Sequence, residues 1–169
     1  KWFAIPQLFR YERQQKGRLR EHFQFNADLI GETSPAADAE LIALLIDVLR
    51  GFGLTEQDFV IRLSSRNAWQ EYFTRNGGQA GQEYDFFQII DKLERTDPTE
   101  TETKLSAIGL SLANVNAFIE SGHPTTALQS ILDNLAARGL RDFVKIDYRV
   151  IRGLAYYTGV VFEVFDRKG

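Results

Sequence analysis

Cysteine and methionine are both absent from this chain of 169 residues. Without cysteine the chain can form no disulfide bond, no thiolate metal site and no cysteine nucleophile. The two histidines, His22 and His123, are far apart in the sequence, so ligand counting argues against a zinc site. The sequence also lacks an apolar run long enough to cross a membrane and the Gly-x-Ser-x-Gly motif of serine hydrolases, so it supports neither class.

The composition is that of a globular domain. Hydrophobic residues make up 44% of the chain and charged residues 25%, which provides a core and argues against disorder. The length fits one domain with a small insertion. Because the chain begins with Lys1 rather than methionine, we expect it to be an excised fragment. The sequence has no signal-peptide or transit-peptide composition, which favours the cytoplasm, with an organelle matrix as the alternative.

Charge is distributed unevenly along the chain, whose formal net charge is −3. Residues 1–31 carry a local charge of +3 and residues 143–169 carry +2, whereas the residues between them carry −8. The overall balance argues against a dedicated nucleic-acid binder. The two basic ends instead indicate an anionic ligand, provided that they come together in space.

Apolar patterning predicts strands at both ends of the chain and helices between them. Residues 5–13 and 21–31 are typical of an antiparallel hairpin with a long basic loop. The other predicted strands cover residues 59–63, 143–147 and 160–165. The predicted helices cover residues 34–51, 65–75, 82–95, 101–121 with a break near Gly109, and 125–138. This order predicts an α+β fold with an antiparallel sheet, in which residues 67–142 form a helical insertion.

The densest group of chemically capable side chains lies in the predicted hairpin. Arg10 and Glu12 share one face of the first strand, and Arg18 and Arg20 can face back from the second. Guanidinium groups bind phosphate in a bidentate manner and a carboxylate accepts a hydrogen bond from an amino group, so a nucleoside triphosphate would satisfy both. A solvated hairpin tip with an Arg10 to Glu12 ion pair is an equally simple interpretation.

Two further polar sets have a functional and a purely structural interpretation. Gln24, Asn26 and Asp28 alternate onto one face of the second strand, which predicts either a small-molecule pocket or the solvated face of an edge strand. Arg152 and Tyr157 lie in a glycine-containing segment between two predicted strands. That segment offers a fixed cation and a hydroxyl group, or is a turn with aromatic packing.

Taken together, the three sets resemble two motifs of one enzyme family. Phe-Arg-Tyr-Glu at residues 9–12 resembles the Phe-Arg-x-Glu of motif 2 in class II aminoacyl-tRNA synthetases, and the run through residue 31 is similar to its histidyl-tRNA synthetase version. Arg-Gly-Leu-Ala-Tyr-Tyr at residues 152–157 resembles the histidine-specific signature of the same family. The resemblance covers residues 1–66 and 143–169, which would form the catalytic core, and is weak across residues 67–142. It implies a class II synthetase-type antiparallel β-sheet flanked by helices, with a helical insertion.

The resemblance also implies an activity and its partners. The parent enzyme would activate histidine with ATP to histidyl-adenylate and transfer histidine to the 3′ end of histidine tRNA. Mg²⁺ would arrive with ATP as a substrate complex, with no metal bound by the protein itself, and the full-length parent would be a homodimer. Substitution at the α-phosphate requires mainly positioning and charge stabilisation. Because the family's motif 1, motif 3 and anticodon-binding domain are missing, we expect the isolated chain to be inactive.

The family's roles carry over onto the matching positions of this sequence. As catalytic residues, Arg10 would bind the α-phosphate and the histidine carboxylate, and Arg152 would stabilise charge on the α-phosphate. The remaining ATP-binding residues would be Glu12, Arg18 and Phe23, with either Phe23 or His22 as the ring on adenine. The histidine-binding residues would be Gln24, Asp28, Arg152, Tyr156 and Tyr157, and the tRNA-binding residues would be Arg13 and Gln15.

Two paralogous functions are alternatives on the same fold. One is the synthetase-like regulatory subunit of ATP phosphoribosyltransferase in histidine biosynthesis, and the other is the tRNA-sensing synthetase-like domain of a kinase. A paralogue freed from catalysis has no physical reason to keep the phosphate-binding arginines, the imidazole acceptor and the tRNA-facing loop together. Since this sequence keeps all three, we favour the synthetase.

Overall fold

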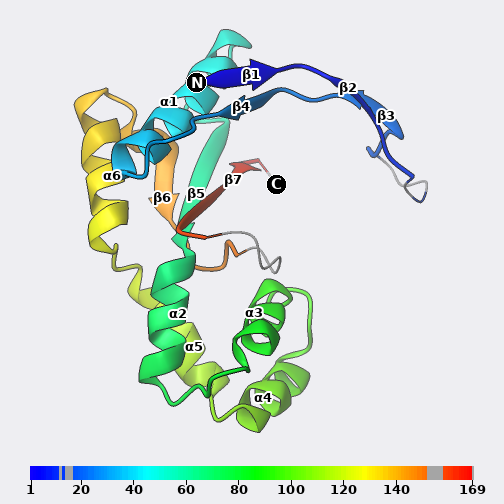
Figure 1. Ribbon diagram of the computed structural model, residues 1–169, viewed down its shortest axis with the longest axis vertical. Helices are drawn as coiled ribbons and strands as arrows, with labels where there is room; N and C mark the ends of the chain where they lie inside the picture. The colour runs from blue at the N-terminus through cyan, green and yellow to red at the C-terminus, as the bar shows by residue number, and fades with distance from the viewer. Residues whose placement is uncertain (12, 14–16, 152–157, 169) are drawn as a thin grey trace.

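The computed structural model describes residues 1–11, 13, 17–151 and 158–168. Its first 33 residues contain the predicted antiparallel hairpin, with each arm divided into two short strands (Figure 1). These strands are β1 (Trp2–Ala4), β2 (Gln7–Phe9), β3 (Glu21–Phe23) and β4 (Asn26–Asp28). β1 pairs with β4 and β2 with β3 in one continuous register. Pro6 divides the first arm because it has no amide hydrogen, although its carbonyl accepts a hydrogen bond from the Gln24 amide at 3.1 Å.

The hairpin extends outward from the rest of the molecule (Figure 1). Many of its large apolar side chains are therefore exposed, among them Trp2 at 69%, Phe9 at 73% and Phe23 at 71%. The base of the hairpin meets α1 (Pro35–Gly51), where Lys1 forms an ion pair with Glu40. The outer half of the hairpin, which carries the predicted phosphate ligands, is consequently separate from the core.

Local sequence signals set the bounds of the elements that follow. Ser34 stands in extended conformation before Pro35, the first residue of α1. Ser65 ends β5 (Phe59–Ser65) and caps α2 (Arg66–Arg75), since its hydroxyl accepts a hydrogen bond from the Ala68 amide at 3.2 Å. Both helices therefore start within one residue of the predicted positions, 34 and 65.

The helical segment after α2 contains four α-helices in the described chain, followed by a short 3₁₀ turn. They are α3 (Glu83–Asp91), α4 (Pro98–Ala107), α5 (Leu112–Ser121), α6 (Thr126–Ala137) and η1 (Arg141–Phe143). The predicted break at Gly109 is confirmed, because this glycine adopts a φ of +79° between α4 and α5. The predicted start of α4 was three residues late, since Asp97 caps this helix through the amides of Thr99 and Glu100.

A three-stranded sheet contains β6 (Val144–Ile146), β5 and β7 (Val160–Asp166), in that order. β7 runs antiparallel to β5, and Arg62 lies opposite Glu163. β6 runs parallel to β5, a pairing that the long helical crossover between them permits. The α+β class is confirmed, whereas this sheet is mixed rather than wholly antiparallel, and the hairpin strands form separate two-stranded sheets.

One hydrophobic core joins the sheet to the helices. Its buried side chains come from α1, β5, β6, α2 and the four α-helices that follow α2. At one end of this core the Trp69 indole has ring contacts with Tyr72, Phe86, Phe118 and Tyr148. Among the described residues, no helix has both the length and the apolar character needed to cross a membrane. The division into a core of residues 1–66 and 143–169 and an insertion of residues 67–142 stays a prediction.

Candidate functional site

One face of the hairpin gathers most of its polar side chains. Residues that are directly opposite on antiparallel strands point to the same side, and every second residue along a strand shares that side. Leu8 lies opposite His22, and the Arg10 amide donates a hydrogen bond to the Arg20 carbonyl at 2.8 Å. The register therefore places six polar residues on one face: Arg10, Arg20, His22, Gln24, Asn26 and Asp28.

A basic cavity of about 390 Å³ lies at the outer end of this face. Arg10, Arg18 and His22 line it together with two residues of the loop. The arginines are exposed, whereas His22 is half-buried and its Nδ1 has no hydrogen-bond partner within the described chain. Two guanidinium groups beside an imidazole ring can bind the oxygens of a phosphorylated ligand and contact a planar group.

The register distinguishes the two candidate rings of the second strand. Phe23 lies opposite Gln7 on the other face of the hairpin, where it is 71% exposed. His22 shares its face with Arg10 and lines the same cavity as Arg18. The geometry thus favours His22 over Phe23 as the ring beside Arg10 and Arg18, the predicted phosphate-binding residues. The sequence alone could not assign His22 and Phe23 to the two faces of the hairpin, because strand alternation does so only when the register is known.

The predicted histidine ligands of the second strand lie away from the cavity. The Gln24 side chain donates a hydrogen bond to the Asn26 side chain at 2.6 Å. Asp28 is exposed at the base of the hairpin, opposite Trp2. It lies eight residues from Arg20, which is roughly 26 Å along extended backbone. The structure therefore brings Arg10 and Arg18 together with His22, but it does not bring Asp28 to the same cavity.

Five of the predicted site residues, Glu12, Gln15, Arg152, Tyr156 and Tyr157, lie outside the described residues. Arg13 is described and exposed. The chain that leads toward residue 152 is buried, with Val150 and Ile151 at 5% and 6% exposure. On the other side, the Gly159 carbonyl accepts a hydrogen bond from the Arg66 amide at 2.7 Å. Both described flanks of the histidine-signature segment are therefore attached to the body of the protein.

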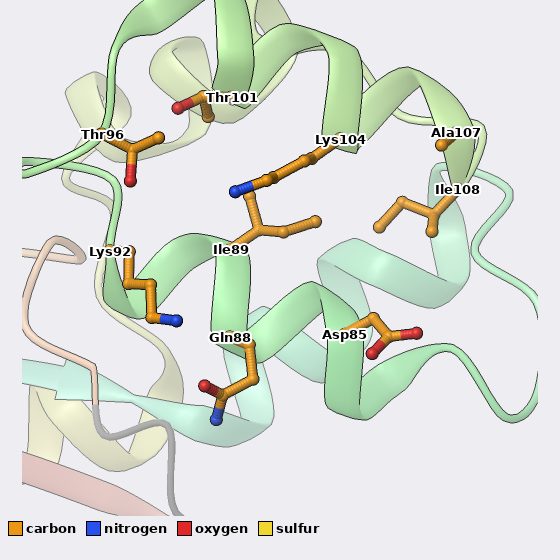
Figure 2. A pocket seen from close by; sticks show the side chains of 9 residues that line it. All are labelled: Asp85, Gln88, Ile89, Lys92, Thr96, Thr101, Lys104, Ala107 and Ile108. Atoms are coloured by element: carbon orange, nitrogen blue, oxygen red, sulfur yellow. The ribbon is translucent and has the colours of Figure 1, made fainter.

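A separate cavity of about 350 Å³ lies between α3 and α4 (Figure 2). Its polar side chains are those of Asp85, Gln88, Lys92, Thr96, Thr101 and Lys104. Lys104 donates to Glu100 at 2.6 Å, and the Thr101 hydroxyl donates to the Asp97 carbonyl at 3.0 Å. The polar groups of Thr101 and Lys104 are therefore engaged by α4 and its cap residue Asp97. Within the described ranges, no group of three or more His, Asp and Glu side chains is arranged to hold a metal ion.

Comparison with known proteins gives a consistent assignment. A family model described as histidyl-tRNA synthetase matches residues 1–169. The chain is similar to the histidine–tRNA ligase of Opitutus terrae, at 44% identity over 100% of this chain and 44% of the relative. It is also similar to the chloroplastic/mitochondrial histidine–tRNA ligase of Arabidopsis thaliana, at 35% identity over 100% of this chain and 38% of the relative. The chain thus spans about two fifths of the length of these curated relatives.

Two solved structures share the fold. A crystal structure of histidyl-tRNA synthetase from Nostoc matches 96% of this chain and 43% of its own, with a TM-score of 0.76 and 21% identity. A structure from Bacillus halodurans, described as an ATP phosphoribosyltransferase regulatory subunit/histidyl-tRNA synthetase, matches 97% of this chain and 47% of its own, with a TM-score of 0.75 and 21% identity. These similarities confirm the expected fold type.

Proposed function

This chain belongs to the histidyl-tRNA synthetase family, and we propose that it is part of the catalytic core of a class II enzyme that makes histidyl-adenylate from histidine and ATP and then transfers histidine to the 3′ end of histidine tRNA. The observation that carries the proposal is the basic cavity formed by Arg10, Arg18 and His22. It lies on the motif that the sequence shares with this family. Nothing in the proposal requires a resident metal, since Mg²⁺ enters with ATP.

The residues of the cavity have defined tasks in this reaction. The histidine carboxylate attacks the α-phosphorus of ATP, and pyrophosphate leaves with its magnesium ion. Arg10 binds the α-phosphate and the carboxylate, which aligns the two reactants and offsets the charge that builds up between them. Arg18 binds the β- and γ-phosphates, and a ring from the second strand, His22 by the register, lies against adenine. In this proposal the Glu12 carboxylate accepts a hydrogen bond from the adenine amino group.

The histidine pocket and the tRNA contacts use residues from both ends of the chain. Gln24 and Asp28 on the hairpin, with Tyr156 and Tyr157 on the signature segment, bind the amino acid, and Arg152 adds positive charge at the α-phosphate. In the hairpin loop, Arg13 and Gln15 approach the tRNA acceptor end. We propose that the full-length parent acts as a homodimer in the cytoplasm or an organelle matrix.

Histidine-dependent exchange between ATP and pyrophosphate in the full-length parent tests the proposal. Arg10→Ala should lower kcat/KM by about 100-fold or more, because one preorganised donor at a transition-state charge is worth about 3 kcal/mol. Arg50→Ala is the matched control, since Arg50 is an exposed arginine of α1 that pairs with Asp47 at 3.4 Å. Equal rates for Arg10→Ala and the control would overturn the role of Arg10. Absence of exchange from the unmodified parent would overturn the proposed activity.

The same assay separates the synthetase from the regulatory-subunit alternative. The two solved structures have nearly equal TM-scores, and their identities of 21% reflect the fold alone. A regulatory subunit would show no histidine-dependent exchange and would instead stimulate ATP phosphoribosyltransferase when the two are mixed. The arginines at the hairpin tip favour the synthetase, because a subunit without phosphate chemistry has no need of them.

A further inference from the structure

A buried carboxylate lies directly after β6, outside the candidate site. Asp147 is only 6% exposed. Its Oδ2 lies 3.4 Å from Arg62 Nη1 of β5, and its Oδ1 lies 3.7 Å from Arg149 Nη1. The Arg149 amide also donates a hydrogen bond to Oδ1 at 3.1 Å. Asp147 therefore connects the central strand of the sheet to the chain that follows β6.

The neighbouring residues attach the same chain to other parts of the molecule. The Asp147 amide extends the pairing with β5 by donating to the Leu63 carbonyl at 2.9 Å. The Trp69 indole donates to the Tyr148 carbonyl at 3.0 Å, and the Tyr148 hydroxyl donates to the His123 carbonyl at 2.7 Å. Asp147 and Tyr148 are consequently anchored to β5, to α2 and to the α5–α6 connection shortly before the chain reaches residue 152.

Stability alone does not explain a charged group at this position. Burying a carboxylate between two arginines costs about as much desolvation energy as the attraction returns, and apolar side chains would be at least as stable. Arg62 is itself fixed, because its guanidinium lies 3.8 Å from the centre of the Phe165 ring. The ion pair instead fixes an orientation, because it holds the Asp147 carboxylate and the Arg149 amide bound to it in one arrangement.

We propose that Asp147 is a positioning residue, which through Arg62 and the Arg149 amide fixes the backbone that leads into Arg152. The inference rests on the proposed function, because Arg152 is assigned to the α-phosphate only there. Asp147 itself contacts no substrate in this proposal. Its effect reaches the reaction because a displacement of about 1 Å in a positioned group can cost about 100-fold in rate.

The test measures histidine-dependent exchange in the full-length parent. Asp147→Asn retains the size of the side chain but removes its charge, and we expect kcat to fall about 10- to 100-fold while the KM values for ATP and histidine change less than about threefold. Glu94→Gln is the matched control, since it removes only the exposed partner that lies 3.9 Å from Arg149 Nε, and it should leave kcat within about twofold.

A second control distinguishes positioning from loss of stability. Leu128→Ala removes a fully buried side chain of α6, remote from Asp147 in the sequence, and lowers the melting temperature without touching the ion pair. If Asp147→Asn lowers kcat no more than Leu128→Ala does, with both assayed well below their melting temperatures, the inference is overturned. Arg62→Gln combined with Asp147→Asn should cost no more than the larger single change, and additive losses would also contradict it. Absence of exchange from the unmodified parent would refute the proposed function, and this inference with it.

Discussion

Replacing Trp69 by phenylalanine should destabilise the chain by about 2–4 kcal/mol. Trp69 is fully buried, and its indole donates a hydrogen bond to the carbonyl of Tyr148, a residue that is 1% exposed. Phenylalanine leaves that carbonyl buried without a donor, which costs about 1–3 kcal/mol. The smaller ring also leaves a cavity of about 40 Å³, worth about 1 kcal/mol. The ring contacts with Phe118 and Tyr72 are retained in part, so they add little to the loss.

Urea unfolding of the 169-residue chain, followed by far-ultraviolet circular dichroism, measures this change. Tryptophan fluorescence would be unsuitable, because the substitution removes Trp69 and the remaining tryptophan, Trp2, lies on the hairpin. The melting temperature should fall by about 4–16 °C for a chain of this size. Trp2→Phe is the matched control, and since Trp2 is 69% exposed its effect should stay within about 0.5 kcal/mol. A Trp69→Phe chain as stable as this control would refute the reasoning.

Three further predictions concern pH, tRNA and ATP. Mainly because the Lys168 side chain donates a hydrogen bond to it, Asp58 has its pKa lowered from the ordinary 3.8 to about 2. A lowered carboxyl pKa stabilises the fold above about pH 4, and this contribution is lost as the pH falls toward 2. Asp58→Asn should therefore make the urea midpoint depend less steeply on pH over that range. An unchanged pH dependence of the urea midpoint would contradict the assignment. Arg13→Ala in the full-length parent should leave exchange within about twofold yet slow histidine transfer to tRNA at least about fivefold, whereas equal losses in both assays would count against a tRNA role. Arg10 and Arg18 are exposed, and an exposed ion pair with phosphate contributes about 1 kcal/mol. The isolated chain should therefore bind ATP with a Kd no tighter than about 1 mM and show no exchange. A micromolar Kd measured by calorimetry would overturn this prediction.

Features of the fold that depend on neighbouring residues were predictable from the sequence. The start of the helix at residue 65 and the break at Gly109 were predictable because a helix cap and a glycine act within a few residues of themselves. The direction of β6 was not predictable in this way, because it depends on how the helices between β5 and β6 return the chain to the sheet. Prediction from local pattern therefore succeeded for the elements and was incomplete for their pairing.

The candidate site shows the same division. The arginines of the hairpin stood out because residue type and alternation are visible in the sequence. The choice between His22 and Phe23 was not visible, since a shift of one residue in register exchanges the two faces of a strand. Asp147 gave no signal at all, because a single aspartate after a strand is ordinary until Arg62 and Arg149 are seen on either side of it.

The distribution of burial separates the residues of the candidate site from those that stabilise the fold. In the described chain the buried core begins at Ala37, whereas Arg10 and Arg18 lie exposed on a hairpin that extends beyond it. Water and salt weaken the electrostatic interactions of exposed charges. For the proposed adenylate formation, these arginines would therefore bind phosphate strongly enough only if other parts of the full-length parent exclude solvent from the cavity. Loss of Arg10 should then change activity with almost no change in stability, and loss of Trp69 should do the reverse.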